Sequence, residues 1–385
     1  MNLIGLYIHI PFCKQKCKYC DFISFENCED KIINQYINAL IEEIKFRANS
    51  LKTIDNQFLV KTIYIGGGTP SIINDKHIYN ILDTIYDNFE IMNNCEISIE
   101  VNPGTVNEAK LKTYKEIGIN RLSIGLQTAN NRLLKLIGRI HDYDDYINTI
   151  NSAKKIGFTN INTDLIIGLP TQTIYDVEDT LDKILKLDLT HISVYSLILE
   201  ENTELAKLVN SNKLKLPDEE IERYMYWYAK RRLEDNGFIH YEISNFALPS
   251  YRCQHNIDCW NQKEYIGIGL NAASYMSNLR FKNISDLRQY ILNIKNNKWQ
   301  ANSIIEEKQT KRDQMNEFII LGLRMSNGVS LDKFEKKFQE NMSDIYWNSI
   351  IKLIQDNLVV IDDNRYLKLT KKGLDYANIV WEAFL

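Results

Sequence analysis

Residues 6–22 read LYIHIPFCKQKCKYCDF and join a short apolar run to three closely spaced cysteines. The run Leu6–Pro11 has the apolar and β-branched content of a buried strand. Cys13, Cys17 and Cys20 follow it directly, so three thiols lie within eight residues at the end of the first predicted strand. A loop this short can surround one corner of a metal centre, and the spacing predicts such a centre here.

From this stretch to about residue 199, short apolar segments alternate with helix-length segments. The predicted strands are Leu6–Pro11, Thr62–Gly67, Glu96–Asn102, Arg121–Gln127, Asn160–Gly168 and His191–Leu199. The predicted helices between them are Asp30–Arg47, Asp75–Asn88, Asn107–Ile117, Asn130–Leu136, Tyr143–Ile156 and Tyr175–Leu187. Because crossovers between parallel strands are right-handed, six such units form an incomplete barrel. The predicted fold class is α/β, a partial (βα)6 TIM-like barrel.

The alternation ends after a long charged and aromatic helix, Asp218–Asn236. We expect three units: a barrel over residues 1–236, an aromatic-rich extension over 237–305, and a smaller C-terminal domain over 306–385. The composition of residues 245–280, rich in aromatic residues, Cys, Gly and Asn, predicts irregular loops and short strands packed near the barrel. In the C-terminal domain, the pattern predicts three helices followed by two short strands, which is typical of a winged-helix-like fold. The predicted helices are Asp313–Leu323, Ser330–Lys337 and Ile345–Asp356, and the predicted strands are Leu358–Ile361 and Tyr366–Leu369. We expect this domain to pack as a lid without a nucleic-acid role.

Composition excludes several classes of protein. The 46 basic residues are balanced by 50 acidic ones, with a net charge of −4 and a pI near 6.0, which argues against binding to nucleic-acid phosphates. No segment approaches the roughly 20 consecutive apolar residues of a transmembrane helix. Seven cysteines without an export signal indicate metal or redox chemistry rather than a disulfide framework. We therefore expect a cytoplasmic protein.

The cysteine loop has two interpretations. An iron–sulfur cluster is commonly held by four thiolates, and three leave one iron open to an exchangeable ligand. The neighbouring lysines favour thiolate forms. The alternative is a structural zinc site, which closes with four ligands, the fourth being His9 or Asp21.

Polar groups also gather at the ends of the other predicted strands. Gly66–Pro70 ends the second strand, and its glycines allow backbone amides to approach a ligand closely. Glu100, Gln127 and Asp164 lie at or near the ends of the third, fourth and fifth strands. Since barrel active sites are built at the carboxyl ends of the strands, these side chains together predict a pocket beside the cysteine loop.

Together these motifs resemble those of the radical S-adenosylmethionine (SAM) superfamily, within it the family of the heme chaperone HemW and the related oxygen-independent coproporphyrinogen III oxidases. The segments that carry the resemblance are 7–13 (YIHIPFC), 66–71 (GGGTPS), 100–103 (EVNP), 123–127 (SIGLQ) and 164–170 (DLIIGLP). The similarity runs over nearly the whole chain. The resemblance implies a [4Fe–4S] cluster on Cys13, Cys17 and Cys20. It also implies contacts to SAM from Tyr7, Tyr19, Gly67, Gly68, Thr69, Glu100, Gln127, Arg139 and Asp164. The cofactor would then be cleaved to a 5′-deoxyadenosyl radical, although whether turnover occurs is left open.

Two features favour the chaperone over the oxidase. The oxidases extend the triad with a fourth cysteine two positions further on, where this chain has Phe22, and they carry an additional N-terminal segment, whereas Tyr7 lies almost at the N-terminus. The segment 253–260 (CQHNIDCW) resembles a His-Asn-x-x-Tyr-Trp segment of the HemW group, with Cys259 where tyrosine is usual. His255 is thereby a candidate heme ligand. The alternative is an ordinary hydrogen-bonded histidine in an aromatic-rich loop.

We therefore predict a heme chaperone that binds heme and transfers it to an acceptor protein, with the cluster and SAM supporting that task. The alternatives are an oxygen-independent coproporphyrinogen III oxidase and a structural zinc protein. The expected partners are heme and a heme-acceptor protein, for which a respiratory protein is one candidate. Peripheral membrane contact and a homodimer are left open, and no nucleic acid is expected.

Overall fold

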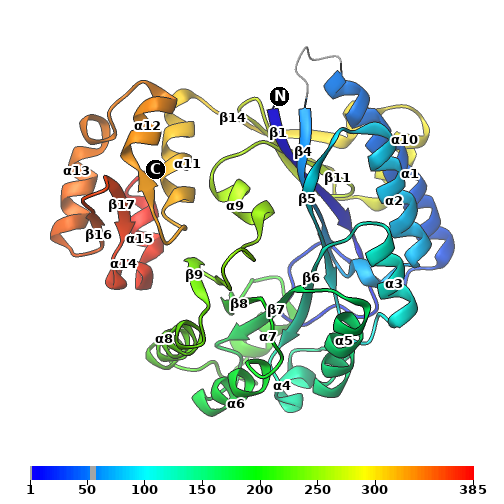
Figure 1. Ribbon diagram of the computed structural model, residues 1–385, viewed down its shortest axis with the longest axis horizontal. Helices are drawn as coiled ribbons and strands as arrows, with labels where there is room; N and C mark the ends of the chain where they lie inside the picture. The colour runs from blue at the N-terminus through cyan, green and yellow to red at the C-terminus, as the bar shows by residue number, and fades with distance from the viewer. Residues whose placement is uncertain (1, 53–57) are drawn as a thin grey trace.

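A curved sheet of parallel strands forms the centre of the computed structural model, which describes residues 2–52 and 58–385 (Figure 1). Six parallel strands lie side by side in chain order: β1 (Asn2–Ile10), β4 (Phe58–Gly67), β5 (Ile91–Val101), β6 (Arg121–Gln127), β7 (Asn160–Ile167) and β8 (His191–Ser196). The predicted partial (βα)6 barrel is therefore confirmed. β1, β4 and β5 begin earlier than predicted, because their first residues also pair: residues 2–4 of β1 lie opposite residues 58–60 of β4, and Val60 lies opposite Ile91 of β5.

Helices cover the outer face of this sheet (Figure 1). They are α1 (Asp30–Lys52), α2 (Asp75–Asn88), α3 (Glu108–Glu116), α4 (Asn131–Leu136), α5 (Tyr143–Ile156), α6 (Ile174–Ile184) and α8 (Glu219–Asp235). A short 3₁₀ helix, η1 (Pro70–Ile72), follows β4, and α7 (Glu204–Asn210) begins beside the cysteine segment, where Leu205 N donates to Lys18 O at 2.8 Å. Local signals fix their ends. For example, Asp142 and Asp145 form a reciprocal capping box at the start of α5, and Gly157 ends the helix in a left-handed conformation with φ of 95°.

The central sheet continues beyond the predicted barrel at both edges. β9 (Ile239–Glu242) and β10 (Asn245–Ala247) extend it past β8. On the other side, β1 is followed by β11 (Tyr265–Ile268), β12 (Ala273–Met276), β13 (Leu279–Asn283) and β14 (Ser303–Lys308). The sequence predicted only loops and short strands in 245–280, so the helix α9 (Gln254–Trp260) is an addition, as is α10 (Leu287–Lys295), which precedes the 3₁₀ helix η2 (Trp299–Asn302). In Figure 1, α9 lies inside the curve of the sheet.

The C-terminal residues form a separate hydrophobic core of their own. Helices α11 (Lys311–Gly322), α12 (Leu331–Phe338) and α13 (Met342–Gln355) precede the strands β16 (Val359–Ile361) and β17 (Tyr366–Leu369), as predicted, and β15 (Val329–Ser330) completes a three-stranded sheet. The chain ends with α14 (Lys371–Asp375) and α15 (Ala377–Glu382). The division of the chain at residues 236 and 305 stays a prediction. In the part of the chain that the structure describes, no helix has the length and apolar character needed to cross a membrane.

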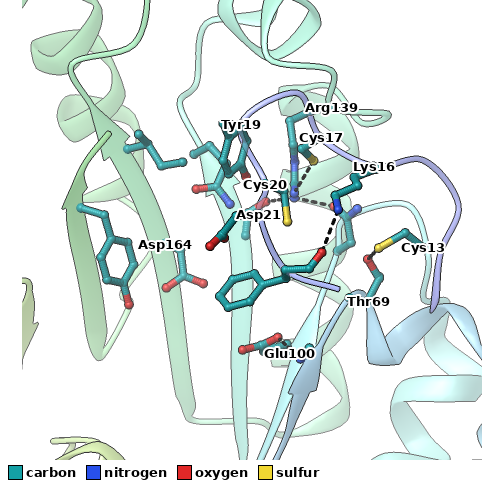
Figure 2. Close-up of a pocket in the computed structure, with 18 of the residues that line it drawn as sticks. Cys13, Lys16, Cys17, Tyr19, Cys20, Asp21, Thr69, Glu100, Arg139 and Asp164 are labelled. Carbon is teal, nitrogen blue, oxygen red and sulfur yellow. Dashed lines mark hydrogen bonds between the residues drawn. The ribbon is translucent and has the colours of Figure 1, made fainter. Parts of the chain in front are cut away.

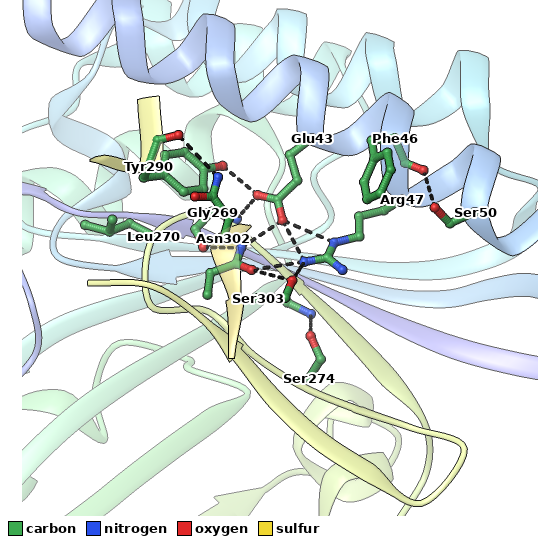
Figure 3. Close-up of polar contacts among 12 residues, drawn as sticks. Glu43, Phe46, Arg47, Ser50, Gly269, Leu270, Ser274, Tyr290, Asn302 and Ser303 are labelled. Carbon is green, nitrogen blue, oxygen red and sulfur yellow. Dashed lines mark hydrogen bonds and ion pairs between the residues drawn. The ribbon is translucent and has the colours of Figure 1, made fainter. Parts of the chain in front are cut away.

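A buried polar network joins the extension to helix α1 (Figure 3). The Glu43 carboxylate accepts hydrogen bonds from Gly269 N at 2.9 Å, from the Tyr290 hydroxyl at 2.5 Å and from Asn283 Nδ2 at 2.8 Å. Arg47 forms an ion pair with the same carboxylate at 3.0 Å. Because Glu43 is almost fully buried, these donors compensate the loss of its hydration and fix β11 to β13 against α1.

Candidate functional site

The cysteine loop forms one wall of a cavity of about 580 Å³ at the carboxyl ends of the parallel strands (Figure 2). Cys13 is buried within the two-residue strand β2 (Phe12–Cys13), which pairs with β3 (Phe25–Glu26). Cys17 and Cys20 are half-buried and line the same cavity. The loop is tied to the end of α4, since Lys18 N donates to Ile137 O at 2.9 Å. The structure thus brings the three thiols together at the border of one cavity.

The glycine-rich end of β4 packs directly beneath this loop. Gly68 N donates to Ile10 O at 2.9 Å, and Thr69 N donates to Phe12 O at 2.8 Å. A Cβ atom on Gly68 would lie 2.8 Å from Phe12 O and 3.0 Å from Cys13 Sγ, so the loop and the strand end meet only because this residue is glycine. The Thr69 hydroxyl donates to Cys13 Sγ at 3.5 Å.

Two half-buried carboxylates face the opposite side of the cavity. Glu100 accepts from the Tyr64 hydroxyl at 3.0 Å and from Gly67 N at 3.1 Å, and burial, together with the nearby charge of Asp164, raises its pKa to about 7. Asp164 accepts from Asn162 Nδ2 at 2.8 Å and from the Ser123 hydroxyl at 3.2 Å, and burial raises its pKa as well. Such carboxylates favour a ligand that supplies positive charge or hydroxyl donors.

Gln127 and Arg139 occupy the wall between the thiols and the carboxylates. Gln127 ends β6 in the left-handed region with φ of 72°. Arg139 Nη2 donates to Gly125 O and to Asn102 Oδ1, both at 2.6 Å, and Nη1 lies 3.5 Å from Cys17 Sγ. The guanidinium is therefore fixed in place before any ligand enters.

Of the residues expected to contact SAM, eight line this cavity: Tyr19, Gly67, Gly68, Thr69, Glu100, Gln127, Arg139 and Asp164. Tyr7 does not line it. Its hydroxyl lies 2.9 Å from His9 Nδ1, and its ring stacks on Tyr64 with centroids 6.3 Å apart. The cavity also includes residues that sequence reasoning missed, among them Tyr64, Asn102, Ser123 and Tyr195. Tyr195 lies at the end of β8, so the rule used for the other strand ends would have found it.

His255 lies outside the cavity, behind Tyr64. Its Nδ1 is 2.9 Å from the Thr62 hydroxyl, and its ring stacks on Tyr64 with centroids 5.3 Å apart. The residue is 7% exposed, and burial followed by the charge of Arg121 lowers its pKa to about 4. The imidazole is therefore neutral, the form that binds iron. Cys253, two residues earlier, is fully buried, and burial raises its thiol pKa to about 12.

The donor set fits an iron–sulfur cluster with one open iron. Three thiols border a cavity large enough for a cofactor, a glycine leaves room beside Cys13, and polar groups extend from the thiols to the carboxylates. Among residues 2–52 and 58–385, no three His, Cys, Asp or Glu side chains are arranged around the position of a single metal ion.

Comparisons with known proteins agree with this geometry. Residues 7–184 match the model of the radical SAM superfamily, and residues 309–376 match that of the HemN C-terminal domain. The chain is 38% identical to the heme chaperone HemW of Lactococcus lactis, with 98% of this chain and 96% of that protein covered. It is 35% identical to HemW of Bacillus subtilis, with 98% of each chain covered. The solved structure of coproporphyrinogen III oxidase (HemN) from Escherichia coli superimposes with a TM-score of 0.84 at 25% identity, covering 100% of this chain and 90% of that one.

The barrel and the thiol-lined cavity at its strand ends are those of a radical SAM protein. Within that superfamily, the chain belongs to the family of the heme chaperone HemW. A [4Fe–4S] cluster and SAM are the cofactors of the superfamily, so this chain uses both.

Proposed function

We propose that this protein is a heme chaperone that binds heme and passes it to an acceptor protein in the cytoplasm. The observation that carries the proposal is the similarity to HemW over 98% of the chain. The cysteine loop agrees with it, because Phe22 occupies the position where the oxidases have a fourth cysteine; this residue lines the cavity and is 61% exposed.

In this proposal Cys13, Cys17 and Cys20 hold the cluster, and the cavity beside them holds SAM. Glu100 and Asp164 receive the amine and ribose hydroxyls, while Gly67, Gly68 and Thr69 contact the methionyl part. When bound, the two cofactors supply one-electron chemistry that side chains lack. The residues that line the cavity would fix the position of the ligand. They would also limit the access of water to the open iron.

The proposed heme ligand, His255, is closed off by the way α9 is anchored to the barrel. Glu96 accepts hydrogen bonds from Gln254 N at 2.9 Å and from His255 N at 3.0 Å, which caps the start of the helix. Asp258 forms an ion pair with Lys61 at 2.8 Å. Because the imidazole faces β4, heme can reach it only after α9 moves away from the sheet.

The other end of α9 is held by the C-terminal domain. The Arg324 guanidinium stacks on Trp260 at 4.3 Å from its ring centroid and lies 5.4 Å from the centroid of Trp381. Arg324 Nε and both indole N–H groups are buried without a hydrogen-bond partner. Each such unpaired buried group costs about 1–3 kcal/mol of stability. When α9 moves away, water can bind these groups, and this gain offsets part of the stacking energy that is lost. This contact is therefore suited to release α9 for heme loading.

The test is transfer of heme from the purified chain. Hemin-loaded protein mixed with an excess of an apo heme protein should lose its Soret absorption while the acceptor gains its own. The rate of this transfer should exceed the rate at which hemin dissociates from an unrelated carrier protein. Binding so weak that hemin partitions like the free compound would contradict the proposal. The related alternative, coproporphyrinogen III oxidase activity, is favoured by the fold shared with HemN and by the match to the HemN C-terminal domain.

A further inference from the structure

The guanidinium of Arg139 joins the cysteine loop to the strand ends, and we propose that it sets the reduction potential of the cluster through a hydrogen bond to the Cys17 sulfur. Nη1 lies 3.5 Å from Cys17 Sγ, within the range of an N–H···S hydrogen bond (Figure 2). In this role Arg139 acts on a ligand of the cluster itself, whether or not SAM is present.

The position of Arg139 is fixed by groups other than a cofactor. Nη2 uses both of its hydrogens, one on Gly125 O and one on Asn102 Oδ1, each at 2.6 Å. A Cβ atom on Gly125 would lie 3.0 Å from Nη2, so glycine at this point of β6 permits the close approach. With one end of its planar fork held on two acceptors, the guanidinium presents Nη1 to Cys17 in a single orientation.

Asn102 is itself held in place, because its Oδ1 lies 3.1 Å from His141 Nδ1. In this orientation the side-chain oxygen of Asn102 can accept hydrogen bonds from both Arg139 and His141. The flipped orientation would place the Asn102 amide nitrogen, itself a donor, against these two donors. Burial, together with the charge of Arg139, lowers the pKa of His141 to about 3, so this imidazole is neutral. Asn102 and His141 are thus positioning residues that act through Arg139.

The three thiols receive unequal hydrogen bonds. Cys13 accepts a hydrogen bond from the neutral hydroxyl of Thr69 at 3.5 Å. Among the described residues, a cationic side chain donates a hydrogen bond to Cys17 and to neither of the other two thiols. Charge-assisted hydrogen bonds are roughly twice as strong as neutral ones, and hydrogen bonds to the sulfurs tune cluster potentials.

The direction of the effect follows from charge. One-electron reduction by an external reductant adds one negative charge to the cluster and its thiolates, and a cationic donor on Cys17 stabilises that reduced form more than the oxidised one. The partly buried position of Arg139 strengthens this stabilisation, because water screens it less. Loss of the donor should therefore make the midpoint potential more negative.

The experiment is an equilibrium redox titration of the reconstituted cluster without SAM or heme, followed by electron paramagnetic resonance of the reduced form. Arg139→Met should have a more negative midpoint than the unaltered protein, and Arg139→Lys should lie between them. Asn102→Ala should shift the midpoint in the same direction and add no further shift when combined with Arg139→Met. The matched control is Arg132→Met on α4, whose guanidinium contacts Thr171 and which should leave the midpoint unchanged.

Iron and sulfide content and thermal unfolding of each variant show whether the cluster loop is intact. If Arg139→Met fails to hold a cluster, Arg139→Lys and Asn102→Ala carry the same test. A midpoint unchanged in the cluster-bearing variants would overturn the proposal. If Arg139 acted only by binding SAM, the variants would bind SAM more weakly, and the midpoint potential of the cluster measured without SAM would not change. Because heme is absent throughout, this result is independent of the chaperone assignment.

Discussion

His255 stacks on Tyr64 with ring centroids 5.3 Å apart. Tyr64 in turn donates a hydrogen bond to Glu100, which faces the cofactor cavity. The proposed heme segment and the proposed SAM site therefore share one aromatic side chain as their wall. While α9 is packed against the sheet, Tyr64 thus links the residue proposed to bind heme to a carboxylate of the proposed SAM site.

Replacing His255 by alanine should weaken heme binding, because the neutral imidazole that would ligate iron is removed. Hemin titration followed at the Soret band should show a weaker and shifted band for His255→Ala. The matched control is His77→Ala, on α2 and outside the cavity. Equal spectra for His255→Ala and the unaltered protein would remove His255 from the heme site.

Loosening the C-terminal hold on α9 should speed heme binding. Arg324→Ala removes the cation stacked on Trp260, so α9 should leave the sheet more often. Stopped-flow mixing with hemin should show a faster rise of Soret absorption in this variant. Arg312→Ala, which removes a similar stacking contact on Tyr346, is the control and should leave the rate unchanged. An equal or slower rate in Arg324→Ala would show that α9 release does not limit loading.

Glu100 should make the stability of the cofactor-free protein depend on pH. Its pKa rises on folding from the ordinary value of 4.5 to about 7, so the folded state binds more protons than the unfolded state between these values. The free energy of unfolding should therefore fall as pH rises through this window. Glu100→Gln should flatten this part of the profile in urea unfolding. An identical slope in both proteins would assign the pH dependence to other groups.

The same carboxylate predicts the pH dependence of ligand binding. A cationic ligand beside Glu100 lowers its pKa and favours the ionised form. SAM affinity, measured by calorimetry, should therefore decrease as pH falls from about 7, and this decrease should be smaller in Glu100→Gln.

Glu43 should be essential for the stability of the extension (Figure 3). Its removal leaves the half-buried Arg47 without its ion-pair partner and takes an acceptor from Gly269 N and the Tyr290 hydroxyl. Glu43→Ala should lower the free energy of unfolding by about 3–5 kcal/mol. The adjacent Glu42→Ala removes only an exposed ion pair with Lys45 and should change it by less than about 1 kcal/mol. Similar losses for the two variants in urea unfolding would contradict this account of the network.

The sequence predicted what depends on local pattern. The six parallel strands follow from apolar runs of strand length, and the cavity follows from polar residues at their ends. Gly68 could be expected near a ligand, although its closeness to Cys13 could not. The helix α9 was not predicted, because its seven residues carry no helical apolar stripe and it is held by contacts with Glu96 and Arg324, which are distant in sequence.

Other features depend on side-chain orientation, which a motif does not determine. The sequence singled out His255 as a residue type suited to heme, but its burial against Thr62 depends on how α9 packs inside the sheet. Arg139 was expected to contact SAM, yet its hydrogen bond to Cys17 joins two residues 122 positions apart. Such contacts become visible only when the elements are placed in space.

One measurement separates the heme chaperone most directly from the oxidase with the same fold. Anaerobically reconstituted and reduced protein, with its cluster verified by iron and sulfide content, is incubated with coproporphyrinogen III and SAM, and a parallel sample receives hemin. The account predicts a Soret band with hemin and no protoporphyrinogen IX from coproporphyrinogen III. Formation of protoporphyrinogen IX at more than one equivalent per chain, without stable hemin binding, would contradict it.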